Sequence, residues 1–205
     1  MAAVEKFKAS AVVNQLRHIE RTIQNPENKD IDFKRSYLNY VLSPDREMSS
    51  YDYYKSRKED LYCYNRPDVN TMAGWVVTAP KELRQSEHDE FFQVTYNFLE
   101  NRYSVENVVS AVVHNDESGQ PHLHFTFIPV AADPKHGGEK ICANEVLNRE
   151  ELRNFHSDLQ RCLDKNGVNA RVTNGATAGG NRTVRELKRD RERFRGHERV
   201  RETRF

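Results

Sequence analysis

Residues 114–124 read His-Asn-Asp-Glu-Ser-Gly-Gln-Pro-His-Leu-His, which places three histidines and two carboxylates within eleven positions. Apolar, β-branched and aromatic residues fill 108–113 before this stretch and 125–130 after it, so the pattern predicts a β-hairpin with a polar turn. Residues two apart on a strand share a face, so His122 and His124 point the same way, and hairpin closure brings His114 to them. Three histidine nitrogens that leave coordination positions open are typical of a catalytic divalent-metal site.

The two carboxylates of this stretch allow more than one interpretation. Asp116 and Glu117 can each ligate the metal directly. Alternatively, either can accept the second ring N–H of a ligand histidine and so fix its tautomer. Asp116 fits equally well as a turn residue whose side chain shapes the loop. The sequence leaves these roles open.

The rest of the chain predicts an α+β fold, an antiparallel β-sheet flanked by helices. At 205 residues the length suits one domain with an appendage, and the 31% charged residues favour a soluble protein. We expect no membrane segment, because no apolar run approaches the ~18 residues needed to span a bilayer. Alternation and capping residues predict strands over 1–8, 36–42 and 74–78, and helices over 10–24 and 49–60, from 86 onward, and from 148 to about 165.

The last 25 residues differ from the rest in charge. Lysines and arginines outnumber aspartates and glutamates ten to five over 181–205, after a Gly- and Thr-rich stretch at 173–180. Thr183 and Glu186 have the spacing of a capping box, which predicts a helix. We therefore expect a catalytic domain over 1–180 and a charged helix over 181–205. A helix this polar is either exposed to solvent or binds a polyanion, and it would lead to a C-terminal region absent from this chain.

The first helix presents a histidine on its polar side. Its apolar stripe is made by Val12, Leu16, Ile19 and Ile23. His18 and Arg21 fall on the opposite side together with Asn14 and Asn25. A histidine exposed to solvent beside a surface arginine would show the same pattern, so the spacing alone does not assign a function.

Several motifs, in order, carry a family resemblance. They are Arg17-His18-Ile19-Glu20-Arg21, Asn28-Lys29-Asp30-Ile31, the segment from Arg35 to Tyr40, and 114–124 with Pro129 beyond it. This order resembles that of the Mob/Pre relaxases, the MOBV class of plasmid mobilisation enzymes within the HUH endonuclease superfamily. The triplet His122-Leu123-His124 corresponds to the histidine pair that brackets a hydrophobic residue in that superfamily. The resemblance covers nearly the whole chain, and the turn after Glu117 is one residue longer than is usual in the family.

The resemblance implies an HUH relaxase/Rep-like fold and a DNA relaxase activity. Such an enzyme nicks one strand at the origin of transfer of a mobile element and stays covalently bound to the 5′ end, which initiates conjugative mobilisation. By resemblance, His18 is the nucleophile and forms a 5′-phosphohistidine, His114, His122 and His124 hold the metal, and Glu117 orients a metal-bound histidine. Arg21 belongs to the catalytic set and contacts phosphate, and the resemblance adds four further DNA-binding residues, Arg17, Arg35, Asn39 and Tyr40.

The resemblance also implies a cofactor and partners. Mn²⁺ is the expected metal; Zn²⁺, Co²⁺ and Ni²⁺ suit histidine ligands too, whereas Mg²⁺ prefers oxygen. The expected substrate is single-stranded or hairpin origin-of-transfer DNA. Accessory mobilisation proteins, a coupling protein and a homodimer formed through the absent C-terminal region are further expected partners. The expected location is the bacterial cytoplasm, and three cysteines without paired spacing fit its reducing conditions.

Other functional classes remain open at this point. A rolling-circle replication initiator would usually place its nucleophile after the histidine pair, whereas His18 precedes it, which favours a relaxase. A tyrosine nucleophile is also chemically competent, and the chain offers Tyr40, Tyr51, Tyr53 and Tyr54. A single-stranded DNA-binding protein with a structural metal and a hydrolase of small phosphoesters are the further alternatives.

Overall fold

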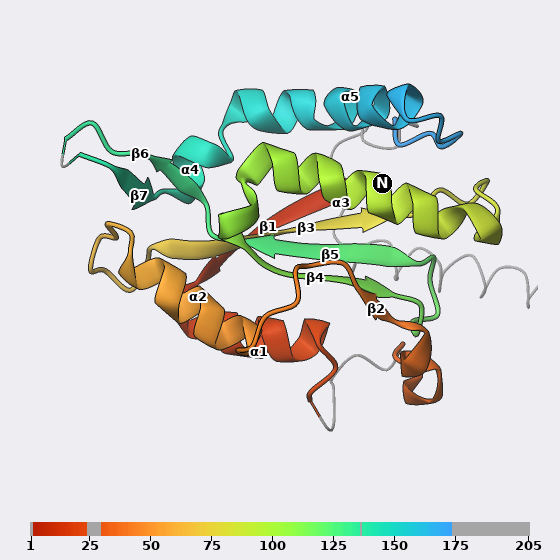
Figure 1. Cartoon of the computed structure of the whole chain (residues 1–205), viewed down its shortest axis with the longest axis horizontal. Helices are drawn as coiled ribbons and strands as arrows, with labels where there is room; N and C mark the ends of the chain where they lie inside the picture. Colours follow the sequence, from red (N-terminus) through yellow and green to blue (C-terminus); the bar gives the residue numbers. More distant parts are fainter. Residues whose placement is uncertain (1, 24–29, 136, 174–205) are drawn as a thin grey trace, which may run out of the picture. The chain divides into compact units, whose positions relative to one another are not determined.

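The computed structural model describes residues 2–23, 30–135 and 137–173, and its centre is a five-stranded antiparallel sheet (Figure 1). The strands run in the order β1-β3-β5-β4-β2. Their bounds are Ala2–Lys8 for β1, Tyr40–Val41 for β2, Asn70–Thr78 for β3, Val108–His114 for β4 and His122–Phe127 for β5. The predicted α+β architecture, an antiparallel sheet flanked by helices, is confirmed.

Helices cover both faces of this sheet (Figure 1). The helices α3 (His88–Tyr103) and α5 (Arg149–Lys165) share a hydrophobic core with one face, in which Phe91 and Phe155 are fully buried. The helices α1 (Ala9–Ile19) and α2 (Ser50–Glu59) share a second core with the other face. The described part also contains a short helix, α4 (Ala143–Val146), and a small hairpin of β6 (Val130–Ala132) and β7 (Glu139–Ile141). Its 3₁₀ turns are η1 (Phe33–Leu38), η2 (Gln85–Glu87) and η3 (Val105–Asn107).

Strand alternation decides which face carries the histidines. Leu123 and Phe125 of β5 are fully buried in the core beneath α3 and α5. Side chains alternate along a strand, so His122 and His124 lie on the other face, the one covered by α1 and α2. In the antiparallel pairing of β4 with β5, His114 is directly opposite His122, as the predicted hairpin requires. The sheet thus places all three imidazoles on the α1 side.

The prediction for the first helix was wrong at its C-terminus. The helix α1 begins at Ala9, directly after β1, and ends at Ile19, not at residue 24. Glu20 caps it, and Arg21 has a left-handed backbone with φ of 56°. A non-glycine residue in this region costs roughly 1–2 kcal/mol, so strong contacts of the arginine side chain must offset the strain. Those contacts belong to the metal centre described below.

The segment 36–42, predicted as one strand, was also assigned wrongly. It forms the end of η1 and the two-residue strand β2, which pairs with β4 through Tyr40 and Val41. The side chain of Asp32 accepts a hydrogen bond from the backbone N–H of Lys34 and starts the 3₁₀ turn. The strand expected over 125–130 lies instead at 122–127, and β6 begins at Val130.

The helices expected over 49–60 and from 148 onward both form. Ser49 accepts a hydrogen bond from Asp52 N at the start of α2, and the predicted cap Asn148 accepts from the backbone N–H groups of Glu150 and Glu151 at the start of α5. Gly167, with φ of 74°, follows the end of α5, as the Asn166-Gly167 pair predicted. The predicted boundary near 180 and the charged helix over 181–205 lie outside the described residues. None of the helices in the described part is long and apolar enough to cross a membrane.

Candidate metal centre

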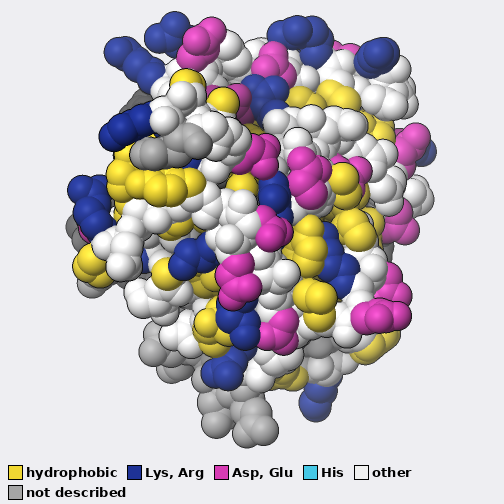
Figure 2. Space-filling view, turned by 60° about the vertical axis from the view of Figure 1, so that its left-hand side comes forward, with side chains coloured by type: hydrophobic (Ala, Val, Ile, Leu, Met, Phe, Trp, Pro, Cys, Tyr) yellow, Lys and Arg dark blue, Asp and Glu magenta, His cyan; other side chains and the backbone are white. Residues whose placement is uncertain are grey.

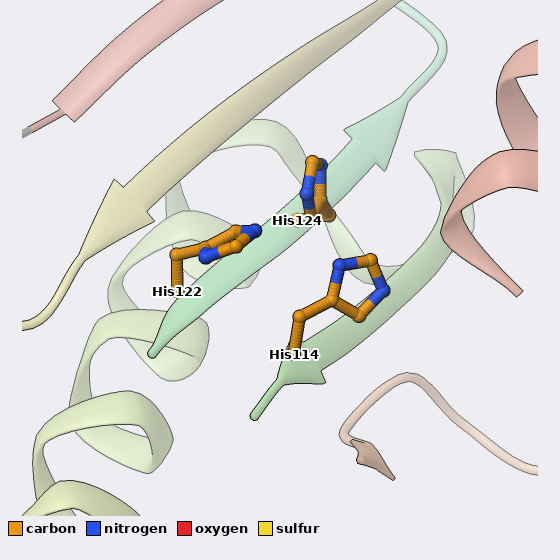
Figure 3. Close-up of side chains that lie close together, drawn as sticks. All are labelled: His114, His122 and His124. Atoms are coloured by element: carbon orange, nitrogen blue, oxygen red, sulfur yellow. The ribbon is translucent and has the colours of Figure 1, made fainter. Parts of the chain in front are cut away.

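The three predicted histidine ligands converge on one point. His114 comes from the end of β4, and His122 and His124 come from β5 (Figure 3). One ring nitrogen of each lies within 4.8 Å of the others. Their ring centroids are 4.6 to 5.4 Å apart. This spacing lets three nitrogen atoms bind one ion while other coordination positions stay open.

Backbone carbonyls fix the tautomers of two of these histidines. The Nε2 atom of His114 lies 2.7 Å from the carbonyl oxygen of Ile19, and Nδ1 of His122 lies 3.1 Å from that of Gln120. A carbonyl only accepts, so these ring nitrogens carry the protons. His114 Nδ1 and His122 Nε2 therefore hold the lone pairs that can ligate a metal. An N–H of Arg21 donates to His114 Nδ1 at 3.0 Å, so a metal bound there would displace this hydrogen bond. The donor set thus fits a divalent ion that favours imidazole, with the outer nitrogens oriented as metal-binding histidines require.

Burial keeps two of the three histidines, His114 and His124, uncharged. Desolvation, helped by the nearby charge of Arg21, lowers the pKa of His114 to about 3. Desolvation and the neighbouring His122 also lower the pKa of His124 well below its ordinary value. Only the neutral form of imidazole binds a metal, so near neutral pH these two rings are in the ligating state without prior loss of a proton.

Arg21 joins the carboxylates of the hairpin turn to the end of α1. Its guanidinium donates to both carboxylate oxygens of Asp116, at 2.8 and 2.7 Å, and to Glu117 Oε1 at 2.8 Å. It also donates to the carbonyl of His18 at 2.9 Å and lies 3.0 Å from His114 Nδ1. Only 9% of the arginine side chain is exposed, so these are buried, charge-assisted hydrogen bonds. They are the contacts that offset the left-handed backbone of Arg21.

The two carboxylates have different surroundings. Asp116 is fully buried and also accepts from Ser36 Oγ at 2.7 Å. Burial alone would raise the pKa of Asp116, but the hydrogen bonds from Arg21 and Ser36 hold it well below the usual range. Glu117 Oε1 stands 3.9 Å from both His114 Nδ1 and His122 Nε2, the nitrogens that face the centre. The outer nitrogens of these rings bind backbone carbonyls instead, so the orienting role expected of Glu117 stays a prediction.

The predicted nucleophile lies beside the three histidines. His18 belongs to the last turn of α1, and its ring centroid is 6.2 Å from that of His124 in an edge-to-face arrangement. The side chain is half-buried. Desolvation, then the charge of Arg21, lowers the pKa of His18 below its ordinary value. Its imidazole is therefore neutral near pH 7 and has a lone pair available for attack.

The tyrosines that could replace it are engaged elsewhere. Tyr40 donates its hydroxyl hydrogen to Asp89 at 3.0 Å and pairs with Val113, whose side chain belongs to the core on the α3 side of the sheet. Tyr53 donates to the carbonyl of Glu106, and the buried Tyr54 bonds to Thr71. The ring of Tyr51 stacks on that of Tyr54. This geometry favours His18 over a phenolic nucleophile.

Comparison with known proteins agrees with the geometry. The model of the family described as plasmid recombination enzyme, Mob_Pre, matches residues 1–189. The chain belongs to this family. A plasmid recombination enzyme of Lactiplantibacillus plantarum is 30% identical over 199 residues, which are 94% of this chain and 54% of that protein. One of Streptococcus agalactiae is 31% identical over 92% of this chain and 38% of its own length. The chain thus spans about half or less of the length of these Mob/Pre relatives.

Solved structures of a Mob/Pre relaxase share the fold. The MobM relaxase domain bound to plasmid pMV158 oriT DNA, in an Mn-bound crystal structure at pH 6.8, superposes with a TM-score of 0.77. Its sequence is 28% identical, and the match covers 93% of this chain and 97% of that one. A second Mn-bound complex of MobM, at pH 4.6, gives a TM-score of 0.74 at 28% identity. The likeness extends over nearly all of the relaxase domain.

The predicted DNA-binding residues of this Mob/Pre chain differ in their surroundings, since some are exposed and others contact the protein itself. Arg17 on α1 and Arg35 on η1 are exposed, so their guanidinium groups can reach a phosphate. Asn39 instead accepts a hydrogen bond from the backbone N–H of Asn115 at 2.7 Å and thereby holds the hairpin turn. On the face shown in Figure 2, basic and acidic side chains are interspersed rather than gathered by sign. That face therefore presents no continuous field of one sign.

Sequence reasoning missed three groups that build the centre. The carbonyls of Ile19 and Gln120 orient two ring nitrogens, and Ser36 Oγ binds Asp116. Every residue has a carbonyl, so no side-chain pattern marks the first two. Ser36 lies in a motif that the sequence analysis singled out, but only the placement of η1 against the turn reveals its partner. That placement is fixed by two backbone hydrogen bonds, Asp32 N to Asp116 O and Ser118 N to Asp30 O.

Lowering the pH below the ordinary pKa of histidine should destabilise the metal-free protein. In the unfolded chain a histidine has a pKa near 6.5, whereas that of folded His114 is about 3. Between these values the unfolded chain binds more protons, so the free energy of unfolding falls with pH by up to about 1.4 kcal/mol per pH unit for each such group. Urea unfolding in EDTA from pH 7 to 4.5 measures this, and His114→Asn should show a shallower dependence. Equal slopes for both proteins would contradict the assignment.

Proposed function

We propose that this chain is the DNA-nicking domain of a plasmid mobilisation relaxase, which cuts one strand at an origin of transfer through His18. The observation that carries the proposal is the neutral imidazole of His18 placed edge-on to His124 in a cluster of three convergent histidines. Membership of the plasmid recombination enzyme family supports it. The likeness to MobM, whose structures hold oriT DNA and Mn, supports both the substrate and the metal.

The proposed reaction is a transesterification without an external water. The lone pair of a His18 ring nitrogen forms a bond to the phosphorus of the scissile phosphate, while the bond from phosphorus to the 3′ oxygen breaks. The His18 ring, cationic once bonded to phosphorus, releases the proton of its other nitrogen; in the net reaction this proton converts the leaving oxygen to a 3′-hydroxyl, and the 5′ end remains on His18 as a phosphoramidate. The phosphoramidate retains the energy of the bond, so the same 3′-hydroxyl can attack it and rejoin the strand.

Other residues of the chain position this step. When bound to His114, His122 and His124, a divalent metal, Mn²⁺ by preference, supplies Lewis-acid stabilisation of the charge on a non-bridging phosphate oxygen. Arg21 fixes the carbonyl of His18 and holds the carboxylates of Asp116 and Glu117 beside the ligand nitrogens through hydrogen bonds. Arg17 and Arg35, both exposed, contact phosphates on either side of the cut.

The partners, the location and the division of the chain into two parts are also proposals. We include accessory mobilisation proteins, a coupling protein and a homodimer among its partners, and the bacterial cytoplasm as its location. We also propose that 1–180 is the catalytic unit and 181–205 a charged helix. Family membership supports the partners and the location, and the basic composition of 181–205 supports a role of that segment at DNA.

A cleavage assay tests this function. Labelled single-stranded oligonucleotides tiled across the DNA upstream of the gene are incubated with the protein and MnCl₂ and run on a denaturing gel. We expect one oligonucleotide to yield a free 3′-hydroxyl fragment and a fragment shifted by covalent protein. Binding to these oligonucleotides without any cleavage would instead favour the non-catalytic DNA-binding alternative.

Two histidine variants locate the metal in the same assay. His122→Ala should weaken Mn²⁺ binding, measured by titration calorimetry, and abolish cleavage together with it. His156→Ala is the matched control, because His156 lies on α5, which covers the opposite face of the sheet. Mn²⁺ binding unchanged by His122→Ala would contradict the proposed ligand set.

A further inference from the structure

We propose that a cleft beside the metal centre binds a nucleobase with an amino group on its Watson–Crick edge, guanine first, from a nucleotide next to the cut phosphate. The inference deepens the proposed function and rests on it, since it assumes that a single DNA strand lies across the histidines. It assigns base selection to residues that neither ligate the metal nor attack the phosphate.

The cleft, of about 420 Å³, lies on the same side of the sheet as the histidines. Its walls come from Glu20 at the end of α1, the loop between β2 and α2, and Ser110 and Val112 of β4. Val112 pairs directly with His124 across the two strands. Glu20 is two residues beyond His18. A strand held at the metal centre therefore has its neighbouring base within reach of this cleft.

The charged groups of the cleft favour hydrogen-bond donors over phosphate. Glu20 and Asp45 are among the residues that line it, and neither has a side-chain hydrogen bond or ion pair within the described part of the chain. Arg46 is already occupied, because it donates to the carbonyls of Val108 and Val109 and stacks on the ring of Tyr53 at 3.6 Å. Two carboxylates against one arginine, whose N–H groups are already engaged, leave the cleft with a net negative charge, which favours N–H groups of a ligand over phosphate.

Apolar side chains supply a surface for the base ring. Val41 and Met48 line the cleft and are 64% and 49% exposed. Val41 pairs with Val112, so the two side chains lie on the same face of the sheet. Large exposed apolar groups beside free carboxylates are the combination that reads an unstacked base, with the face on apolar atoms and the edge on polar ones. A cleft of this size also falls in the range of small-molecule sites.

The chemistry of the bases decides which one fits. In a single strand the Watson–Crick edge is free to be read. Guanine alone presents two adjacent donors there, N1–H and the N2 amino group, which a carboxylate can accept together. Adenine and cytosine each present one amino group beside an acceptor. Thymine presents N3–H between two carbonyls, which would face the carboxylates and be repelled. The expected order is guanine, then adenine or cytosine, then thymine.

A selection experiment measures this order directly. A single-stranded DNA library with a random central segment is retained on the chain in MnCl₂, and the retained strands, whole or cut, are sequenced. The same selection is made with Asp45→Asn, with Glu20→Gln and with the control Glu47→Gln. Glu47 is exposed in the same loop but does not line the cleft. Thermal melting of each variant checks that the fold is retained.

The wild-type chain should prefer guanine over thymine at one position by at least about fivefold, the lower limit for a good base contact. Asp45→Asn and Glu20→Gln should lose or change that preference at that position alone, and Glu47→Gln should keep it. The pocket is overturned if both variants keep the wild-type preference, if all positions weaken equally, or if the wild type shows no preference. If strands are cut but both variants keep the wild-type preference, the base-binding cleft is contradicted and the relaxase function is not. If the variants lose the preference but no strand is cut, the relaxase function is contradicted and the base-binding cleft is not.

Discussion

Replacement of His18 by alanine is expected to lower the rate of strand cutting by at least about 10³-fold, because removal of a nucleophile leaves only binding and electrostatic contributions. Binding of Mn²⁺ and of the oligonucleotide should be unchanged. The three ligand histidines come from β4 and β5, so truncation of a side chain on α1 leaves them in place. The measurement is the single-turnover rate of adduct formation on a denaturing gel, with Mn²⁺ affinity determined in parallel.

The control for this variant is Asn14→Ala, one helical turn before His18 on the exposed part of α1. It should cut at the wild-type rate. An adduct that forms with His18→Ala at an undiminished rate would remove the nucleophile assignment and transfer it to a tyrosine. Cutting lost together with Mn²⁺ affinity would show that His18 acts through the metal centre.

Replacement of Arg21 by methionine should produce the largest loss of stability among single changes in the site. The change leaves the carboxylate of Asp116, with no exposed surface, without its cation. Breaking one partner of a buried ion pair typically costs about 3–5 kcal/mol, a large part of the total stability of an ordinary domain. Urea unfolding at pH 7 measures the loss, and the double variant Arg21→Met/Asp116→Asn should recover part of it because the uncompensated charge is gone.

An exposed ion pair provides the comparison. Arg84 pairs with Glu87 at 2.8 Å, but 78% of the arginine side chain is exposed. Arg84→Met should therefore leave the free energy of unfolding nearly unchanged. If Arg21→Met unfolds at the same urea concentration as Arg84→Met, the network around Asp116 contributes little, and the strained backbone of Arg21 would need another explanation.

The sequence predicted those parts of the fold and site that depend on local patterns. Alternation over 108–113 and around His122 and His124 predicted a hairpin and the shared face of its histidines, both present in β4 and β5. The capping residue Asn148 predicted the start of α5. These features follow from the two periodicities of the backbone and from the free N–H groups at helix ends, which neighbouring residues alone determine.

The parts that failed depend on contacts between segments distant in sequence. The end of α1 was misplaced because Arg21 leaves the helix to reach Asp116, 95 residues further along the chain. The segment 36–42 was assigned as a strand because its alternation is real, but Ser36 is drawn to Asp116, 80 residues away. In both cases a buried carboxylate outweighs the local preference of the chain. Its partners are set by the fold.

The hydrogen bond from His114 Nε2 to the carbonyl of Ile19 has a consequence for the speed of the reaction. One peptide group links the helix turn that carries His18 to the strand that carries a metal ligand. In the proposed reaction, the relative position of the attacking nitrogen of His18 and the metal would thereby be set during folding, before DNA arrives. Little internal freedom would then be lost when the phosphate is engaged, and the attack would have the high effective molarity of an intramolecular reaction.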